Sequence, residues 1–141
     1  MARRTPQPRR QPGSAPAHGT SCPCGLPETY EGCCGRFHRG AAAAPTAERL
    51  MRSRYSAFVQ QDAGYLLRTW HPRTRPPGID FEPGTRWTGL EILGATDGSA
   101  FHTTGTVTFR ASFRGGSLVE RSRFERVDGA WLYVDGDFPE A

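Results

Sequence analysis

All four cysteines of the chain lie in one short stretch, SCPCGLPETYEGCCG, at residues 21 to 35. Cys22 and Cys24 form a first pair, and after eight intervening residues Cys33 and Cys34 form a second. Two pairs of thiolates on tight turns are typical of zinc sites in which four sulfur ligands close a tetrahedron and leave no open position. We therefore expect these four cysteines to bind one zinc ion with a structural role.

The spacing gives the alternatives to zinc less support. A disulfide between the adjacent Cys33 and Cys34 would strain its ring, and persistent disulfides are rare in a reducing cytoplasm. The Cys-x-x-Cys spacing of redox sites is absent. An iron–sulfur cluster and unliganded thiols stay open. Gly25 and Gly35 follow the two pairs, where backbone N–H groups can turn toward the sulfurs, and His38 offers a substitute ligand.

A second group of residues that could do chemistry is an arginine with several carboxylates. Arg54 lies inside the apolar arc of the stretch LMRSRYSAF when that stretch is helical. A buried guanidinium needs a carboxylate, and Glu120, Asp135 and Asp137 fall on core-facing positions of the strands expected below. These groups predict either a buried ion pair that ties a helix to a sheet or an open ligand pocket.

For the pocket, we expect a lining that contains Arg54, Tyr55, Trp70, His71, Glu120, Ser122, Tyr133 and Asp135. Because burial raises the pKa of a carboxylate, such a set could serve a small enzyme of the lyase, isomerase or hydrolase type. The sequence has no nucleophile elbow, phosphate loop or dinucleotide fingerprint. We favour a non-enzymatic binding or adaptor protein, and the sequence does not decide between a protein partner and a small ligand.

Two helices are expected to carry the arginine and part of this lining. Pro45-Thr46 opens the first helix with Thr46 as its N-cap, and apolar residues follow at helical spacing up to Val59. Asp62 caps the second helix, which ends near Trp70 because Pro72 disfavours helical geometry in the residue before it. Residues 72 to 85 are rich in proline and glycine and predict a loop.

From Arg86 onward, alternating residues predict four antiparallel strands with two-residue turns at Asp97-Gly98, Gly115-Gly116 and Asp128-Gly129. Counting outward from these turns places Phe124 opposite Tyr133, Ser122 opposite Asp135, Phe109 opposite Ser122, and Ile92 opposite Thr103. The counts define one apolar face, which holds Leu90, Ile92, Phe101, Val107, Phe109, Ala111, Phe113, Leu118, Phe124, Trp131 and Tyr133. The helices must cover that face, which predicts an α+β cone with a helical hairpin on a curved four-stranded sheet.

Length and charge limit the classes of function. A chain of 141 residues makes one domain with a small appendage. The formal charge of +4 arises entirely in residues 1 to 20, a basic tail that we expect to be disordered, so the charge argues against nucleic-acid binding by the folded body. The sequence has no run for a membrane span and no secretory signal, so we expect a cytoplasmic protein. It does not decide between a monomer and a homodimer.

The cysteine segment resembles the SEC-C zinc motif found on the SecA translocation ATPase and on many other bacterial proteins. With LMRSRYSAFV (50–59), YLLRTWHP (65–72), ERSRF (120–124) and WLYVDG (131–136), the chain resembles the YchJ-like family of small bacterial proteins. The resemblance implies a zinc knuckle at residues 21–40 and a nuclear transport factor 2-like (NTF2-like) domain at residues 45–138. It implies no established activity. The segment LPETYEG between the cysteine pairs is acidic where many SEC-C motifs are rich in lysine, which argues against attraction to acidic partners.

Overall fold

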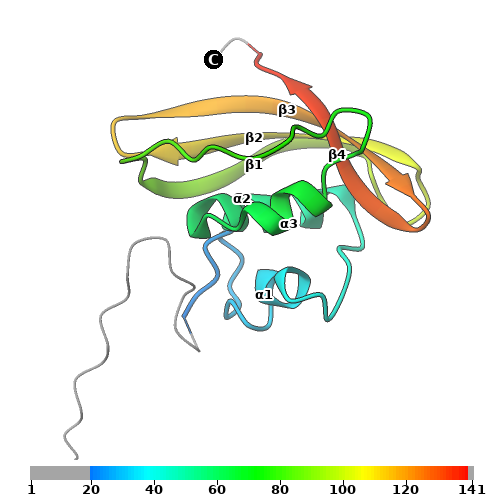
Figure 1. Ribbon diagram of the computed structural model, residues 1–141, viewed down its shortest axis with the longest axis horizontal. Helices are drawn as coiled ribbons and strands as arrows, with labels where there is room; N and C mark the ends of the chain where they lie inside the picture. The colour runs from blue at the N-terminus through cyan, green and yellow to red at the C-terminus, as the bar shows by residue number, and fades with distance from the viewer. Residues whose placement is uncertain (1–19, 140–141) are drawn as a thin grey trace, which may run out of the picture.

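The computed structural model describes residues 20 to 139, so the tail predicted at residues 1 to 20 lies outside the described residues except for Thr20. Its helices are α1 (Cys34–His38), α2 (Ala47–Gln60) and α3 (Ala63–Arg68), and its strands are β1 (Trp87–Asp97), β2 (Thr104–Phe113), β3 (Gly116–Val127) and β4 (Ala130–Asp137). The strands form one antiparallel sheet in the order β1-β2-β3-β4. Helices α2 and α3 lie against one face of the sheet, and α1 lies on their far side (Figure 1). The predicted α+β cone is confirmed.

The helix starts follow from side-chain caps. The Thr46 hydroxyl accepts a hydrogen bond from the Arg49 backbone N–H at the start of α2, and the Asp62 carboxylate accepts one from the Tyr65 N–H at the start of α3. Gln61, with φ of 59°, takes the left-handed conformation that ends α2. Both predicted N-caps are confirmed, and they set α2 and α3 as a hairpin.

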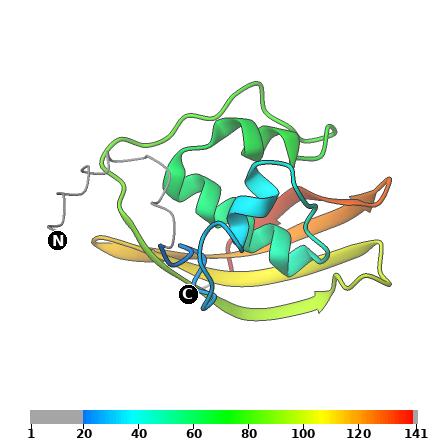
Figure 2. The same cartoon turned by 90° about the horizontal axis from the view of Figure 1, so that it is seen from below.

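Helix α3 ends at Arg68, slightly before the predicted end, because the chain then pairs with the edge of the sheet. Trp70 and Tyr133 form a parallel bridge in which the His71 N–H donates to the Tyr133 carbonyl and the Tyr133 N–H donates to the Thr69 carbonyl. From there the chain runs along the side of the helices to β1 (Figure 2). The segment from 69 to 86 therefore encloses one side of the space between helices and sheet.

The last two hairpins differ in how well their register could be predicted. The turn at Asp128-Gly129 and the Phe124–Tyr133 pair are confirmed, and both turn residues have positive φ. The turn predicted at Gly115-Gly116 is wrong: Phe113 pairs with Gly116, and Phe109 lies opposite Glu120 instead of Ser122. The central turn pair is thus residues 114 and 115. Because this error moves each partner by two residues, it leaves the facing of every side chain unchanged.

The connection between β1 and β2 is longer than the predicted two-residue turn. Ile92 pairs with Phe109, not with Thr103, and residues 98 to 103 form the connection. Hydrogen bonds from the backbone N–H and hydroxyl of Ser99 to the His102 ring shape this loop. Phe101, predicted for the apolar face, therefore lies on the loop and is 93% exposed.

A bulge in β4 overturns the predicted facing of two carboxylates. Arg123 pairs with Asp135 and Phe124 with Tyr133, so β4 has one extra residue, Val134, between the two pairs. The predicted Ser122–Asp135 pair is accordingly wrong. Asp135 lies on the outer face with its carboxylate 2.6 Å from Arg123 Nε.

The carboxylate of Asp137 likewise bonds to an arginine of the outer face, Arg121, at 2.8 Å. Val134 is buried, and its carbonyl accepts a hydrogen bond from the Thr74 hydroxyl. Glu120 and Ser122 therefore lie on the core side of the sheet as predicted, whereas Asp135 and Asp137 lie on the outer face.

The hydrophobic core lies between α2, α3 and the inner face of the sheet. Its fully buried side chains include Leu50, Leu66, Val107 and Phe124. Trp131 closes one end of this core, and its indole N–H donates to the Pro45 carbonyl. Within residues 20 to 139, no helix combines the length and apolar character that crossing a bilayer requires.

Candidate functional site

The four cysteines form a buried cluster with the dimensions of a zinc site. Their Sγ atoms all lie within 4.8 Å of one another, and none of the four residues is more than 5% exposed. Cys24 Sγ and Cys33 Sγ are 3.7 Å apart. Tetrahedral zinc with Zn–S bonds of about 2.3 Å requires sulfurs about 3.8 Å apart. The donor set therefore fits one zinc ion.

Two tight turns bring the cysteine pairs together. The Gly25 N–H donates to the Cys22 carbonyl, and Gly25 takes the left-handed backbone at φ of 95°. At the second turn, the N–H groups of Cys33 and Gly35 donate to the Tyr30 carbonyl. A Cβ at position 35 would lie 2.7 Å from that carbonyl oxygen, so this turn requires glycine.

The thiols of the cluster already interact with one another. Hydrogen bonds from Cys24 and Cys34 lower the pKa of Cys22, and donation to Cys22 raises the pKa of Cys34. Burial raises the pKa of Cys33 to about 12. Zinc would replace the thiol protons and hold all four sulfurs as thiolates.

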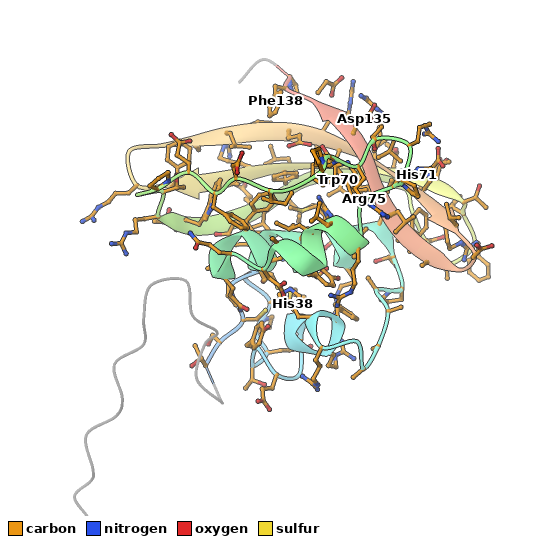
Figure 3. All side chains as sticks on the ribbon, viewed as in Figure 1. His38, Trp70, His71, Arg75, Asp135 and Phe138 are labelled. Atoms are coloured by element: carbon orange, nitrogen blue, oxygen red, sulfur yellow. The ribbon has the colours of Figure 1, made fainter. Side chains whose placement is uncertain are left out.

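The cysteine segment is attached to α2 by polar contacts. His38 Nδ1 lies 2.7 Å from the Tyr30 hydroxyl, and its Nε2 lies 2.8 Å from the Ser53 carbonyl oxygen. Arg52 of α2 donates to the Cys24 carbonyl at 2.8 Å. Burial lowers the pKa of His38, which favours its neutral form. His38, which the sequence offered as a substitute ligand, thus uses Nε2 to join α1 to α2 and Nδ1 to contact Tyr30 of the cysteine segment, and it lies between the two helices in Figure 3.

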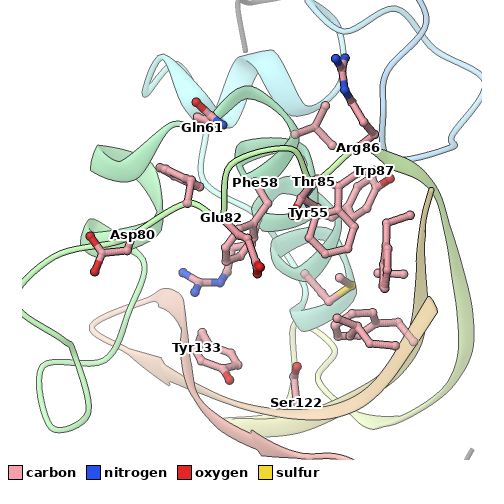
Figure 4. A pocket seen from close by; sticks show the side chains of 18 of the residues that line it. Tyr55, Phe58, Gln61, Asp80, Glu82, Thr85, Arg86, Trp87, Ser122 and Tyr133 are labelled. Atoms are coloured by element: carbon pink, nitrogen blue, oxygen red, sulfur yellow. The ribbon is translucent and has the colours of Figure 1, made fainter. Parts of the chain in front are cut away.

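A large cavity of about 1040 Å³ opens between α2, the segment from 80 to 87 and the inner face of the sheet. Ser122 and Tyr133 rise into it from the sheet, and Tyr55, Phe58 and Trp87 lie across from them (Figure 4). The exposed side chains of Asp80, Glu82 and Arg86 also belong to its lining. The cavity is therefore apolar over most of its walls and charged where it meets solvent.

Arg54 is the buried charged group of this cavity. It is 6% exposed, and its NH1 donates to the Leu66 carbonyl at 2.8 Å and to the Thr69 hydroxyl at 2.7 Å. Its guanidinium carbon lies 5.0 Å from the centre of the Trp70 ring and 4.6 Å from that of Tyr133. Burial lowers the pKa of Arg54 to about 10, so the side chain stays charged near neutral pH.

Glu120 is the carboxylate that reaches the cavity lining, and it does so through hydrogen bonds with two hydroxyl groups. Glu120 Oε2 accepts hydrogen bonds from the Ser122 hydroxyl at 3.0 Å and the Tyr133 hydroxyl at 2.9 Å. Burial and the adjacent Glu120 raise the pKa of Tyr133, which keeps its phenol protonated. Within residues 20 to 139, Arg54 has no carboxylate at ion-pair distance. The ion pair that was one expectation for Arg54 is therefore not formed.

The structure divides the residues expected to line a pocket into two groups. Arg54, Tyr55, Trp70, Ser122 and Tyr133 line the cavity, and Glu120 contacts it through the two hydroxyls. The other two face outward: the His71 ring lies 3.2 Å from Glu125, and Asp135 is turned away by the bulge. Figure 3 shows Asp135 on the strand face away from the helices.

Sequence reasoning missed most of the apolar wall. Phe58, Phe81, Trp87, Phe113 and Leu118 line the cavity, and the first four meet edge to face in two pairs, Phe58–Phe81 and Trp87–Phe113. The alternation predicts Phe113 and Leu118 on the apolar face of the sheet but not as cavity lining, and the signal for Phe81 is the pair of apolar residues in the proline- and glycine-rich stretch GIDFEPG.

Fold and cysteine cluster together define a class of protein: an NTF2-like α+β cone with a four-cysteine knuckle beside its helical hairpin. Residues 46–136 match the family described as "YchJ, middle NTF2-like domain". The chain belongs to this YchJ-like family, whose relatives carry the family name UPF0225.

Relatives of known sequence and structure support this assignment. The chain is 80% identical over 117 residues to a UPF0225 protein of Streptomyces coelicolor, across 83% of this chain and 94% of the relative. It is 70% identical over 138 residues to a UPF0225 protein of Streptomyces avermitilis, across 98% of this chain and 95% of the relative. The solution structure of a SEC-C motif containing protein from Rhodopseudomonas palustris has a TM-score of 0.74 at 33% identity and covers 84% of this chain and 98% of that chain.

A crystal structure of a SEC-C motif containing protein from Psychrobacter arcticus gives a TM-score of 0.72 at 28% identity and covers 88% of this chain and 85% of that chain. The resemblance to YchJ-like and SEC-C proteins is thereby confirmed. None of these names states an activity.

Proposed function

We propose that this protein is a binding protein in which a structural zinc ion fixes the cysteine knuckle against α2 and the NTF2-like cone holds a small molecule in its cavity. One observation carries the proposal: the cavity of about 1040 Å³ has largely apolar walls and a buried, charged Arg54 that no carboxylate neutralises within the described residues. Cavities of this size with few polar groups are typical of ligand sites.

The structural role of zinc is supported by the closed cluster. Four buried sulfurs would complete the tetrahedral shell of the ion and leave no position for water or substrate. Thiols held in this way suit a reducing compartment such as the cytoplasm. We expect about one equivalent of zinc per chain after reducing, chelator-free purification. Less than about half an equivalent would contradict the zinc assignment.

Catalysis is the second candidate, and Glu120 is the observation that favours it, since a carboxylate bonded to two hydroxyls can accept a proton through them. Two features weigh against it. His71 and Asp135, the other groups expected to act as acid or base, face away from the cavity. The carboxylates of Asp80 and Glu82 are exposed to solvent where the cavity opens, so they are not enclosed with a substrate.

The binding function is tested with prodan, a neutral naphthalene dye whose fluorescence rises in apolar surroundings. We expect saturable binding to the wild-type protein and its loss in Ala111→Phe, because Ala111 lines the cavity and a larger side chain would fill it. Ala95→Phe places the same side chain at an exposed position of β1 and serves as the matched control. Equal dye binding by both variants would contradict a site in this cavity.

A further inference from the structure

The guanidinium of Arg54 has hydrogen-bond donors for which the described residues provide no acceptor. Both of its hydrogen bonds within residues 20 to 139 leave from NH1, so Nε and NH2 have no acceptor there. The indole N–H of Trp70, whose ring lies against the same guanidinium, also has no acceptor in the described part of the chain. This end of the cavity therefore has more hydrogen-bond donors than acceptors, and the Glu120 carboxylate acts on the guanidinium from beyond ion-pair distance.

No protein group within residues 20 to 139 accepts a hydrogen bond from Nε or NH2 of Arg54. One oxygen of Glu120 already accepts two hydroxyl protons, and the side chain forms no ion pair with Arg54. Met51, Phe58 and Phe124 are apolar parts of the cavity lining, and the polar side chains of Gln61, Asp80 and Glu82 in that lining form no hydrogen bond or ion pair with Arg54. A buried cation without an anionic partner is costly, and a bound anion relieves that cost.

The shape and charge of the site limit the class of anion. Arg54 is the buried cation of the cavity, so its guanidinium can neutralise a ligand that carries one negative charge. A doubly charged phosphate would bring a second negative charge into apolar surroundings without a buried cation to pair with it. A planar guanidinium matches the two oxygens of a carboxylate. The aromatic walls formed by Tyr55, Phe58 and Trp87 suit a flat apolar body.

We propose that the ligand is an organic carboxylate, bound with its carboxylate at Arg54 and its apolar, preferably aromatic, body between α2 and the segment from 80 to 87. This inference rests on the proposed binding function. The Ser122 and Tyr133 hydroxyl oxygens, whose protons point to Glu120, offer acceptors for a donor group on the same ligand.

The test compares three probes that share one ring system: 2-naphthoate, 2-naphthylmethanol and 2-naphthyl phosphate. Calorimetric titration of the wild-type protein should show 2-naphthoate binding about tenfold to a hundredfold more tightly than the alcohol, the range expected for charge-assisted hydrogen bonds. Arg54→Met should remove this preference and leave the affinity for the alcohol unchanged. Arg54→Lys keeps the charge and should retain part of the preference.

Each contrary result has a distinct meaning. Equal affinity of the wild-type protein for acid and alcohol, with both lost in Ala111→Phe, would overturn the carboxylate assignment and leave the binding cavity standing. Tighter binding of the phosphate than of the carboxylate would also overturn it. If no naphthalene probe and no prodan binds, the proposed function fails together with this inference. The wild-type comparison measures the preference for the carboxylate without requiring any variant to fold.

Discussion

Replacing Arg54 by methionine should change the stability of the unliganded protein very little, although the residue is buried. The ordinary pKa of arginine, 12.5, falls to about 10 on burial of Arg54. At about 1.4 kcal/mol per pH unit, holding this charge costs the folded state about 3 kcal/mol. Arg54→Met regains that free energy. It loses two hydrogen bonds worth about 1.5 kcal/mol each and contacts with two aromatic rings, which the methionine sulfur replaces in part.

The net expectation is a loss of about 1 kcal/mol in the free energy of unfolding, measured by urea denaturation. Without arginine, the Thr69 hydroxyl keeps its hydrogen bond to the Tyr65 carbonyl at 2.7 Å, and the Leu66 carbonyl keeps a longer contact with the same hydroxyl at 3.4 Å. Leu66→Ala, at a fully buried position, is the control and should cost about 2–5 kcal/mol. A loss above about 3 kcal/mol in Arg54→Met would refute the reasoning, since breaking a buried ion pair has that effect.

Three further outcomes follow from particular contacts. Gly136→Ala should cost about 1–3 kcal/mol, because a Cβ there would overlap the Glu120 carboxylate, whereas Gly94→Ala meets no atom within 4 Å and should be nearly neutral in the same urea titration. His38→Phe should destabilise the fold by about 1–3 kcal/mol through its lost hydrogen bonds to Tyr30 and Ser53, and an unchanged denaturation midpoint would contradict this. Burial raises the pKa of all four tyrosines, to about 12 for Tyr55 and Tyr65, so stability present below pH 10 should be lost as the pH rises through the folded-state values. Phenolate absorbance should then appear at higher pH in the folded than in the denatured protein, and coincident titrations would count against buried phenols.

Local signals in the sequence were sufficient for most of the fold. Thr46 and Asp62 cap their helices as expected because a short polar side chain before an apolar stripe meets the free N–H groups of a helix start. Alternation identified the inner face of the sheet, and it survived a register error of two residues because side chains alternate with a period of two. The cysteine spacing led to a cluster whose sulfurs converge.

The features that failed depend on tertiary structure. The bulge at Val134 is stabilised by the docking of residues 70 to 74 on β4, which no local pattern in WLYVDG indicates, and it moved Asp135 to the outer face. The Asp97-Gly98 signal predicts a two-residue turn and hence Phe101 on the sheet, whereas the connection spans residues 98 to 103 and leaves Phe101 exposed on the loop. The cavity depends on where the segment from 80 to 87 lies, and a proline- and glycine-rich sequence does not specify that path.

The central claim is that the cavity at Arg54, and not the cysteine knuckle, is the part that binds. The most direct measurement is a ¹H–¹⁵N NMR titration of the zinc-loaded protein with 2-naphthoate. Perturbed signals should include the Arg54 side-chain Nε–H and the Trp87 indole N–H, while the backbone amides of Cys24 and Cys33 stay in place. Shifts that gather on the cysteine segment or on the outer face of the sheet, with Arg54 unperturbed, would contradict the account.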